Sequence, residues 1–181
     1  MDLFEVIEKR RSIRKFKPDP IPPDDLKKIL EAGRLAPSGG NRQPWKFIVV
    51  RNAETKKALA ITANNQMFIA DADTVIVALG DPTALSMKPP YTLSATRVPH
   101  KQDPMIAVEH MVLAATALGY GTCWIGAFKE EDVKKILNIP EDLTVVALLP
   151  VGVPAENPPP KPRKTFSEIF FQESYGTPLA L

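Results

Sequence analysis

Residues 103–128 read DPMIAVEHMVLAATALGYGTCWIGAF, and this stretch decides what kind of fold the chain can adopt. Asp103 followed by Pro104 is typical of the first turn of a helix, and the residues that follow as far as Leu118 are apolar on almost every side. A helix of this kind must be buried, either in the centre of the protein or against another subunit. The glycines that follow it are typical of a turn, and residues 123–127 are predicted as a short strand.

Helices and strands are predicted on both sides of this stretch, with no internal repeat. Hydrophobic spacing predicts helices over residues 3–10, from a cap at Asp24 to about residue 33, over 54–63 and over 130–137. Strands are predicted over residues 46–50, 74–80 and 143–153, and the last two are expected to be fully buried. A length of 181 residues suits one compact domain, so residues 1–181 are interpreted as a single domain.

The segment from Asp81 to Lys101 follows neither the helical nor the strand period. It contains four prolines (Pro82, Pro89, Pro90 and Pro99) and is long for an irregular connection in a small domain. Loops of this kind are often functional lids, so this segment is expected to lie near a ligand.

The composition excludes several classes of protein. No apolar run approaches the roughly 20 residues that a membrane span needs, and the N-terminus lacks the pattern of a secretory signal. Cys123 is the only cysteine and the chain has two histidines, so neither a disulfide nor a zinc site is expected. A cytoplasmic protein without a metal or a membrane partner is therefore predicted.

The positive charge of the chain is concentrated near its N-terminus. Residues 9–17 carry six lysines and arginines and no acid, although the net charge is only +2, so the rest of the chain carries about −4 (+2 minus +6). A nucleic-acid-binding protein usually spreads its basic residues along a face, so no nucleic-acid partner is expected. Within this segment, the guanidinium groups of Arg10–Arg14 and the hydroxyl of Ser12 suit a phosphate monoester. Taken alone, however, a basic run at a helix end is more often solvated surface.

Three further segments have the composition of ligand-binding loops, and each has a simpler alternative. Residues 36–45 combine paired glycines with the side-chain amides of Asn41 and Gln43, which suit the edge of a heterocycle, but an ordinary turn before a strand looks the same. Residues 119–127 contain glycines without the spacing of a dinucleotide-binding loop, although a backbone N–H could still face a ligand there. Residues 161–164, KPRK, follow a stiff proline run and read equally as a solvated tail.

No known catalytic motif is present in the sequence. There is no Gly-x-Ser-x-Gly elbow, no phosphate-binding P-loop and no HExxH zinc motif. Cys123 lies in an apolar stretch without a histidine nearby in the sequence, which indicates a core cysteine and not a nucleophile.

Six segments, taken together and in this order, resemble the nitroreductase family of FMN-dependent oxidoreductases. They are RRSIR (Arg10–Arg14), APSGGNRQPW (Ala36–Trp45), Asn65, GTCWIGAF (Gly121–Phe128), PVGVP (Pro150–Pro154) and KPRK (Lys161–Lys164). The resemblance implies a three-layer α+β fold with a central, mostly antiparallel mixed sheet flanked by helices. It also implies an intertwined homodimer with FMN sites at the interface.

The resemblance assigns a role to each segment. The phosphate of FMN would be held by Arg10, Arg11, Ser12, Arg14, Lys161 and Arg163. Asn65 would approach the pyrimidine side of the flavin ring, while Ile125 and Gly126 would present backbone N–H groups to its N5 and O4 edge. The loop that reaches FMN from the partner subunit would contain Pro37, Ser38, Gly39, Asn41 and Gln43. No protein side chain is assigned as a catalytic acid or base.

The resemblance also implies a reaction. NADH or NADPH would stack on the flavin, deliver a hydride to N5 and leave, and a small electron acceptor such as a nitroaromatic or a quinone would take its place in a ping-pong mechanism. Because no helical insertion covers the flavin, residues 81–101 would have to do so. Phe68, Met87 and Tyr91 are candidate substrate contacts.

Two alternatives to this reaction remain open at this stage. The same family includes enzymes that carry out reductive dehalogenation or fragment the flavin. A protein of a different class, without enzymatic activity, could bind a polyanion through residues 9–17.

Overall fold

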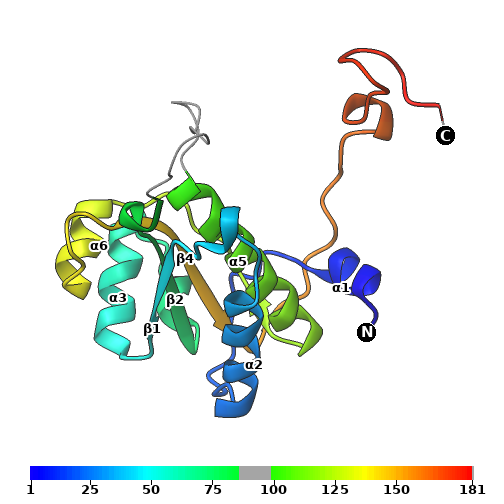
Figure 1. Cartoon of the computed structure of the whole chain (residues 1–181). Helices are drawn as coiled ribbons and strands as arrows, with labels where there is room; N and C mark the ends of the chain where they lie inside the picture. Colours follow the sequence, from blue (N-terminus) through cyan, green and yellow to red (C-terminus); the bar gives the residue numbers. More distant parts are fainter. Residues whose placement is uncertain (86–98, 181) are drawn as a thin grey trace.

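The centre of the molecule is a four-stranded sheet in the order β1-β2-β4-β3. A computed structural model describes residues 1–85 and 99–180, and its strands are β1 (Trp45–Val50), β2 (Thr74–Gly80), β3 (Gly121–Thr122) and β4 (Thr144–Gly152). The three strand pairs are antiparallel, and a parallel bridge joins Ser12 to Thr122 at the edge. The predicted α+β fold with a mostly antiparallel sheet is therefore confirmed (Figure 1).

Helices cover both faces of this sheet, which gives three layers. One face carries α3 (Ala53–Thr62), α4 (Phe68–Asp71) and α6 (Glu130–Leu137), and the other carries α2 (Pro23–Arg34) and α5 (Pro99–Ala117) (Figure 1). The remaining elements are α1 (Leu3–Lys9) and the short 3-10 turns η1 (Gly39–Asn41), η2 (Pro82–Leu85) and η3 (Phe166–Glu168). No helix in residues 1–85 or 99–180 is long and apolar enough to cross a membrane.

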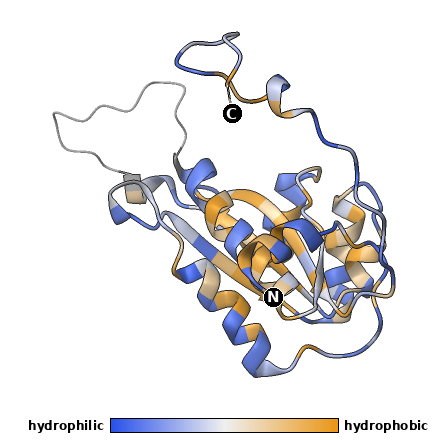
Figure 2. Ribbon diagram, turned by 90° about the vertical axis from the view of Figure 1, so that its right-hand side faces the viewer, coloured by the Kyte–Doolittle hydropathy of each residue, from blue (hydrophilic) through white to orange (hydrophobic). Residues whose placement is uncertain are grey.

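The alternation of side chains in β2 builds two separate cores. Every residue of β2 is buried. Val75, Val77 and Leu79 join the cluster on the α3 side, while Ile76 and Ala78 join the cluster on the α2 and α5 side. Because successive strand residues point to opposite faces, a strand buried on both faces reads as a continuous apolar run. Figure 2 shows the hydrophobic residues concentrated on these inner strands and helix faces.

Helix α5 begins earlier than the sequence indicates, at Pro99, so that Pro104 lies inside it. Proline has no N–H and cannot donate to the carbonyl four residues earlier, which here belongs to His100. That carbonyl packs so closely against Gly80 that a Cβ on Gly80 would overlap it. The expectation of a helix buried on all sides is only partly met, because Met105 and Ile106 remain exposed in the single chain.

Two other predicted boundaries are wrong for local reasons. Helix α2 begins at Pro23 with Pro22 as its N-cap, since proline is well suited to the first helical position, and Asp24 lies within the first turn. The strand predicted over residues 123–127 is not formed, because β3 ends at Thr122. The residue of β4 that follows the β3 pairing is Pro150, which has no N–H to extend the ladder.

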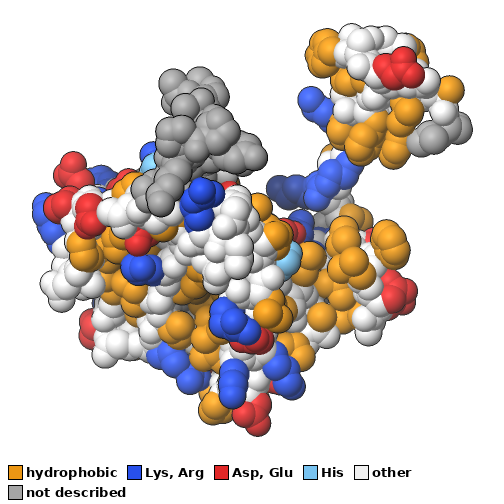
Figure 3. Space-filling view, in the orientation of Figure 1, with side chains coloured by type: hydrophobic (Ala, Val, Ile, Leu, Met, Phe, Trp, Pro, Cys, Tyr) orange, Lys and Arg blue, Asp and Glu red, His pale blue; other side chains and the backbone are white. Residues whose placement is uncertain are grey.

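Residues 157–180 form an arm that leaves the body of the molecule, here called the C-terminal arm (Figure 1). The arm contains η3, whose Thr165 and Glu168 form a capping box, and a small turn closed by a bridge between Phe171 and Pro178. Large apolar side chains of the arm are exposed, among them Tyr175 at 93%. Figure 3 shows these apolar side chains on the arm and others on α1, with basic side chains where the arm leaves the body.

Candidate functional site

The basic segment after α1, residues 10–17, is held in an extended conformation against the sheet edge. The N–H of Ile13 donates to the carbonyl of Thr122 at 2.8 Å, and the side chain of Ile13 is buried, at 6% exposed. Gly121 is required beneath it, because a Cβ there would come within 2.9 Å of Ile13 side-chain atoms. With Ile13 turned inward, the neighbouring Ser12 and Arg14 are directed away from the core, as expected for alternating residues of an extended chain.

Hydrogen bonds to the residues after β4 hold the same segment from the other side. The N–H of Lys17 donates to Val153 O at 2.8 Å, and that of Ala155 donates to Lys15 O at 2.9 Å. Beyond them, the N–H of Arg14 donates to the carboxylate Oε1 of Glu156 at 2.6 Å. The first residues after β4 therefore bring the C-terminal arm back to the basic segment.

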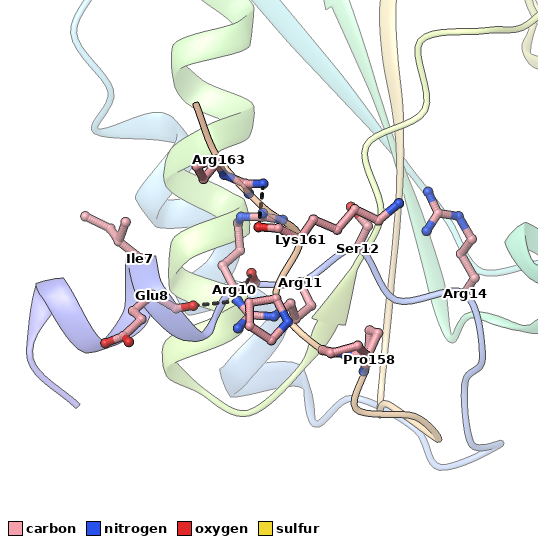
Figure 4. A pocket seen from close by; sticks show the side chains of 11 residues that line it. Ile7, Glu8, Arg10, Arg11, Ser12, Arg14, Pro158, Lys161 and Arg163 are labelled. Carbon is pink, nitrogen blue, oxygen red and sulfur yellow. Dashed lines mark hydrogen bonds between the residues drawn. The ribbon is translucent and has the colours of Figure 1, made fainter. Parts of the chain in front are cut away.

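These two segments enclose a cavity of about 360 Å³. Its lining combines the basic segment with the base of the C-terminal arm: Ile7, Glu8, Arg10, Arg11, Ser12, Arg14, Pro158, Pro159, Pro160, Lys161 and Arg163. Figure 4 shows side chains of both segments around it, with Arg11 turned toward Glu8 and Arg14 to one side. Five of the lining side chains are cationic and one is anionic, so the cavity has a strongly positive potential. All six residues assigned to the phosphate in the sequence thus line one cavity.

The cationic groups of this cavity differ in their partners. The Arg11 guanidinium turns back and donates to the carbonyls of Glu8 and Arg10 at 2.5 and 2.8 Å, which places its charge at the C-terminal end of α1. In residues 1–85 and 99–180, no ion pair within 4 Å joins any of these five cations to a carboxylate. The Arg163 guanidinium also donates to nearby carbonyls, those of Lys161 and Pro162, at 3.3 Å. Arg11 thus fits the helix-end interpretation, and the five cations together form a cluster suited to a dianion.

The loop over residues 36–45 lies outside this cavity, beside the first turns of α5. Gly40, Asn41 and Gln43 have positive φ values of 61°, 54° and 51°, an uncommon conformation for a residue such as Gln43. The loop is closed internally, since Gln43 N donates to Ser38 Oγ at 2.8 Å and Gln43 Nε2 donates to Asn41 O at 3.1 Å. The single chain therefore does not bring Pro37, Ser38, Gly39, Asn41 and Gln43 together with the phosphate residues.

Asn65 lies at the end of α3 with φ of 56°, on the side of the sheet where α4 begins. From α4, the ring of Phe68 lies beneath the guanidinium of Arg14, whose carbon is 6.0 Å from the ring centre. This contact links the start of α4 to the basic segment. The other candidate substrate contacts, Met87 and Tyr91, lie outside the described residues.

The segment after β3 contributes fewer free donors than the sequence indicates. Ile125 exchanges two backbone hydrogen bonds of 3.0 Å with Leu148, so its N–H points into the sheet and not toward a ligand. That part of the prediction is wrong, because an isolated bridge to β4 takes up the group. At Gly126, by contrast, an added Cβ would meet no atom within 4 Å, so Gly126 borders open space, and its role toward the flavin stays a prediction.

Two contacts next to the site were not predicted from the sequence. Glu156 holds the backbone of Arg14, and no local motif signals this contact, since it joins residues 142 positions apart. Cys123 is buried next to the basic segment. Burial raises the pKa of its thiol, an effect that the charge of Arg14 and a hydrogen bond with Ser12 only partly oppose. A neutral, buried thiol fits the core role predicted for it.

Comparison with known proteins agrees with this geometry. Residues 7–153 match the model of the Nitroreductase family. The chain is 33% identical to a protein of Thermus thermophilus named NADH dehydrogenase, over 89% of this chain and 91% of that one. A nitroreductase family protein from Clostridium novyi NT has a similar crystal structure, with a TM-score of 0.77, 38% identity and coverage of 98% and 97% of the two chains.

A larger relative shows the same fold. The structure of the NADPH:FMN oxidoreductase from Vibrio harveyi complexed with NAD+ superposes with a TM-score of 0.86 at 28% identity, over 96% of this chain and 77% of that one. The match to the family model covers most of the chain and includes the basic segment, the loop at residues 36–45 and β4. The chain therefore belongs to the nitroreductase family.

Proposed function

We propose that the protein is an FMN-dependent oxidoreductase that takes a hydride from NADH or NADPH and passes electrons to a nitroaromatic, a quinone or a similar small acceptor. The observation that carries the proposal is the cavity between the basic segment and the base of the C-terminal arm. Its cations have no carboxylate partners within the described chain, and the serine hydroxyl of Ser12 lies among them. Guanidinium and ammonium groups arranged in this way fit a phosphate monoester such as that of FMN.

In this proposal each part of the chain has a separate task. Arg10, Ser12 and Arg14, with Lys161 and Arg163, bind the phosphate, and Arg11 supplies charge from the end of α1. Gly126 offers a backbone N–H and Asn65 a side-chain amide to the ring system. When bound, FMN accepts and donates the hydride, and the protein contributes orientation and electrostatics. Positive charge from this set favours the anionic reduced cofactor over the neutral one.

The loop at residues 36–45 reaches the cofactor only in a dimer. In the single chain, Asn41 and Gln43 lie away from the phosphate cavity, so they complete a site on the partner subunit in the proposed homodimer. The apolar surface supports this assembly, because Phe4 of α1 is 81% exposed and Met105 and Ile106 of α5 are also exposed. In such an intertwined homodimer, residues 1–181 act as one domain whose C-terminal arm extends over its partner.

The experiment that tests the proposal is reconstitution of the purified protein with FMN, followed by absorption spectroscopy and an assay of NADH and NADPH oxidation. We expect stoichiometric flavin absorbance after removal of free cofactor, and acceptor-dependent oxidation of at least one reductant. Riboflavin, which lacks the phosphate, serves as the matched ligand and should bind more weakly. Failure to retain FMN together with no oxidation of either reductant would overturn the proposal.

A further inference from the structure

The loop at residues 38–43 is connected to α5 by a buried carboxylate. Oδ2 of Asp103 accepts a hydrogen bond from the backbone N–H of Gly39 at 3.0 Å, and Asp103 is only 6% exposed. Buried carboxylates are rare in proteins unless they have partners, because removing their charge from water is costly. The hydrogen bond from Gly39 supplies such a partner to the buried Asp103.

The loop that Asp103 holds has an unfavourable backbone conformation. Three of its residues have positive φ, and such conformations persist only where the surroundings fix them. At its far end the carbonyl of Pro44 accepts a hydrogen bond of 3.0 Å from Asp81 N, which follows β2. At its near end the bond from Gly39 to Asp103 is the one that reaches α5. The loop is thus tied at two points to elements that the core holds rigidly.

Helix α5 is packed against the sheet where it carries Asp103. The His100 carbonyl packs on Gly80, and Asp103 precedes Pro104, so the first turns of α5 are fixed against the end of β2. Further along the helix, Ala107, Val108 and Met111 are buried in the core with β2 and β4. Asp103 therefore connects the loop to a part of α5 that is packed against the sheet.

We infer that Asp103 is a positioning residue for the cofactor: it fixes the Gly39 N–H and so orients Asn41 and Gln43 toward the flavin ring. The inference rests on the proposed function, because it assumes that this loop contacts flavin in the dimer. Asp103 does not touch the cofactor itself. Its effect is on the ring and not on the phosphate, which lies in the separate cationic cavity. Because the two sites are separate, the ratio of FMN affinity to riboflavin affinity can be used to test the role of Asp103.

The test uses the full-length protein with FMN and riboflavin as the two probes. Asp103→Ala should weaken the binding of both ligands by about the same factor, about tenfold, because a charge-assisted hydrogen bond is lost and the loop loosens. The ratio of the two affinities should stay as in the unaltered protein. Asp103→Asn keeps an oxygen acceptor for Gly39 N–H and should restore most of the affinity.

Tyr120→Phe is the matched control for a general loss of stability. It removes the hydrogen bond of 2.8 Å from Tyr120 to Asp25, which joins the end of α5 to α2 away from the loop. Flavin affinity should stay within about twofold of the unaltered protein. Equal losses in Asp103→Asn and Asp103→Ala, or a loss confined to FMN, would overturn the inference.

Hydrogen exchange separates this inference from the proposed function. In the absence of flavin, the amides of residues 38–43 should exchange faster in Asp103→Ala than in the unaltered protein, while those of α2 should not change. This result is expected even if the protein binds no flavin, in which case the proposed function fails and the anchoring role stands. Unchanged exchange in the loop would overturn the anchoring role itself.

Discussion

The backbone N–H of Arg14 donates to Oε1 of Glu156 at 2.6 Å, joining residues 142 positions apart in the chain. The bond holds a carboxylate against the backbone of a residue that lines the cationic cavity. A carboxylate in this place repels an anionic ligand, while its hydrogen bond holds the backbone of Arg14. The balance between these two effects can be tested.

Two substitutions of Glu156 should separate the effect of its hydrogen bond on FMN binding from the effect of its charge. Glu156→Gln retains the oxygen acceptor and removes the like charge, so FMN should bind as well as before or more tightly. Glu156→Ala loses the acceptor, frees the backbone of Arg14 and should weaken FMN about fivefold. Fluorescence titration of FMN measures both. Equal behaviour of the two variants would show that the charge, and not the bond, is what matters.

The assignment of the phosphate site predicts a difference between two ligands. Arg10→Ala and Arg14→Ala should each weaken FMN by on the order of tenfold or more, because each removes a charge-assisted interaction with the phosphate. Riboflavin should be affected far less. Calorimetric titration with both ligands measures the ratio, and Lys57→Ala, an exposed cation of α3, is the control. Equal losses for the two ligands would contradict the assignment.

The contact between Gly80 and the His100 carbonyl predicts a large stability difference between two glycines. Gly80→Ala would push a Cβ into that carbonyl and should lower the free energy of unfolding by about 3 kcal/mol or more. Gly126→Ala adds a Cβ that meets open space, at a φ that is not positive. It should change the free energy of unfolding by less than about 0.5 kcal/mol. Urea denaturation of the flavin-free protein measures both. Similar values for the two variants would contradict this packing.

His100 should make stability depend on pH. Burial, assisted by the charge of Lys101, holds the pKa of His100 below its ordinary value of 6.5. The unfolded chain then binds the proton more readily than the folded one, so the free energy of unfolding should fall as pH is lowered through 6.5. The fall should stop below the folded-state pKa. Denaturation curves between about pH 8 and about pH 5 measure it.

Two variants separate the contribution of His100 to the pH dependence of stability from the contribution of the carboxylates. His100→Gln should abolish the fall near pH 6.5, whereas His110→Gln, which leaves His100 in place, should retain it. The chain has two histidines, so the pair of variants covers both. An unchanged pH profile in His100→Gln would show that another group is responsible.

The C-terminal arm should contribute to dimerisation through its apolar side chains. Phe166 and Phe170, whose ring centres are 4.2 Å apart, are about half exposed in the single chain. Replacing both with alanine should weaken the proposed dimer by at least about tenfold, because apolar anchors dominate interface energies. Ser167→Ala, in the same turn, should have little effect. Sedimentation equilibrium measures the dissociation constants, and an unchanged value in the double variant would exclude the arm from the interface.

Elements defined by local pattern could be predicted from the sequence. The continuous apolar run at residues 74–80 is β2 with the predicted bounds, and the amphipathic pattern at residues 130–137 is α6. The order of the six short segments also identified the family, and with it the fold. These predictions succeeded because side-chain periodicity and family motifs are properties of the linear chain.

Tertiary structure decided the features that depend on contacts between distant residues. The first turn of α5 packs closely against Gly80. Strand β3 ends where Pro150 is the next residue of β4. The N–H of Ile125 is taken up by the carbonyl of Leu148. The cationic cavity itself joins two segments near opposite ends of the chain. The sequence by itself thus determined the residue types of the site and the class of fold. Which donors stay free to bind a ligand was decided by the tertiary structure, because each backbone group makes its bonds with whatever the folded chain places beside it.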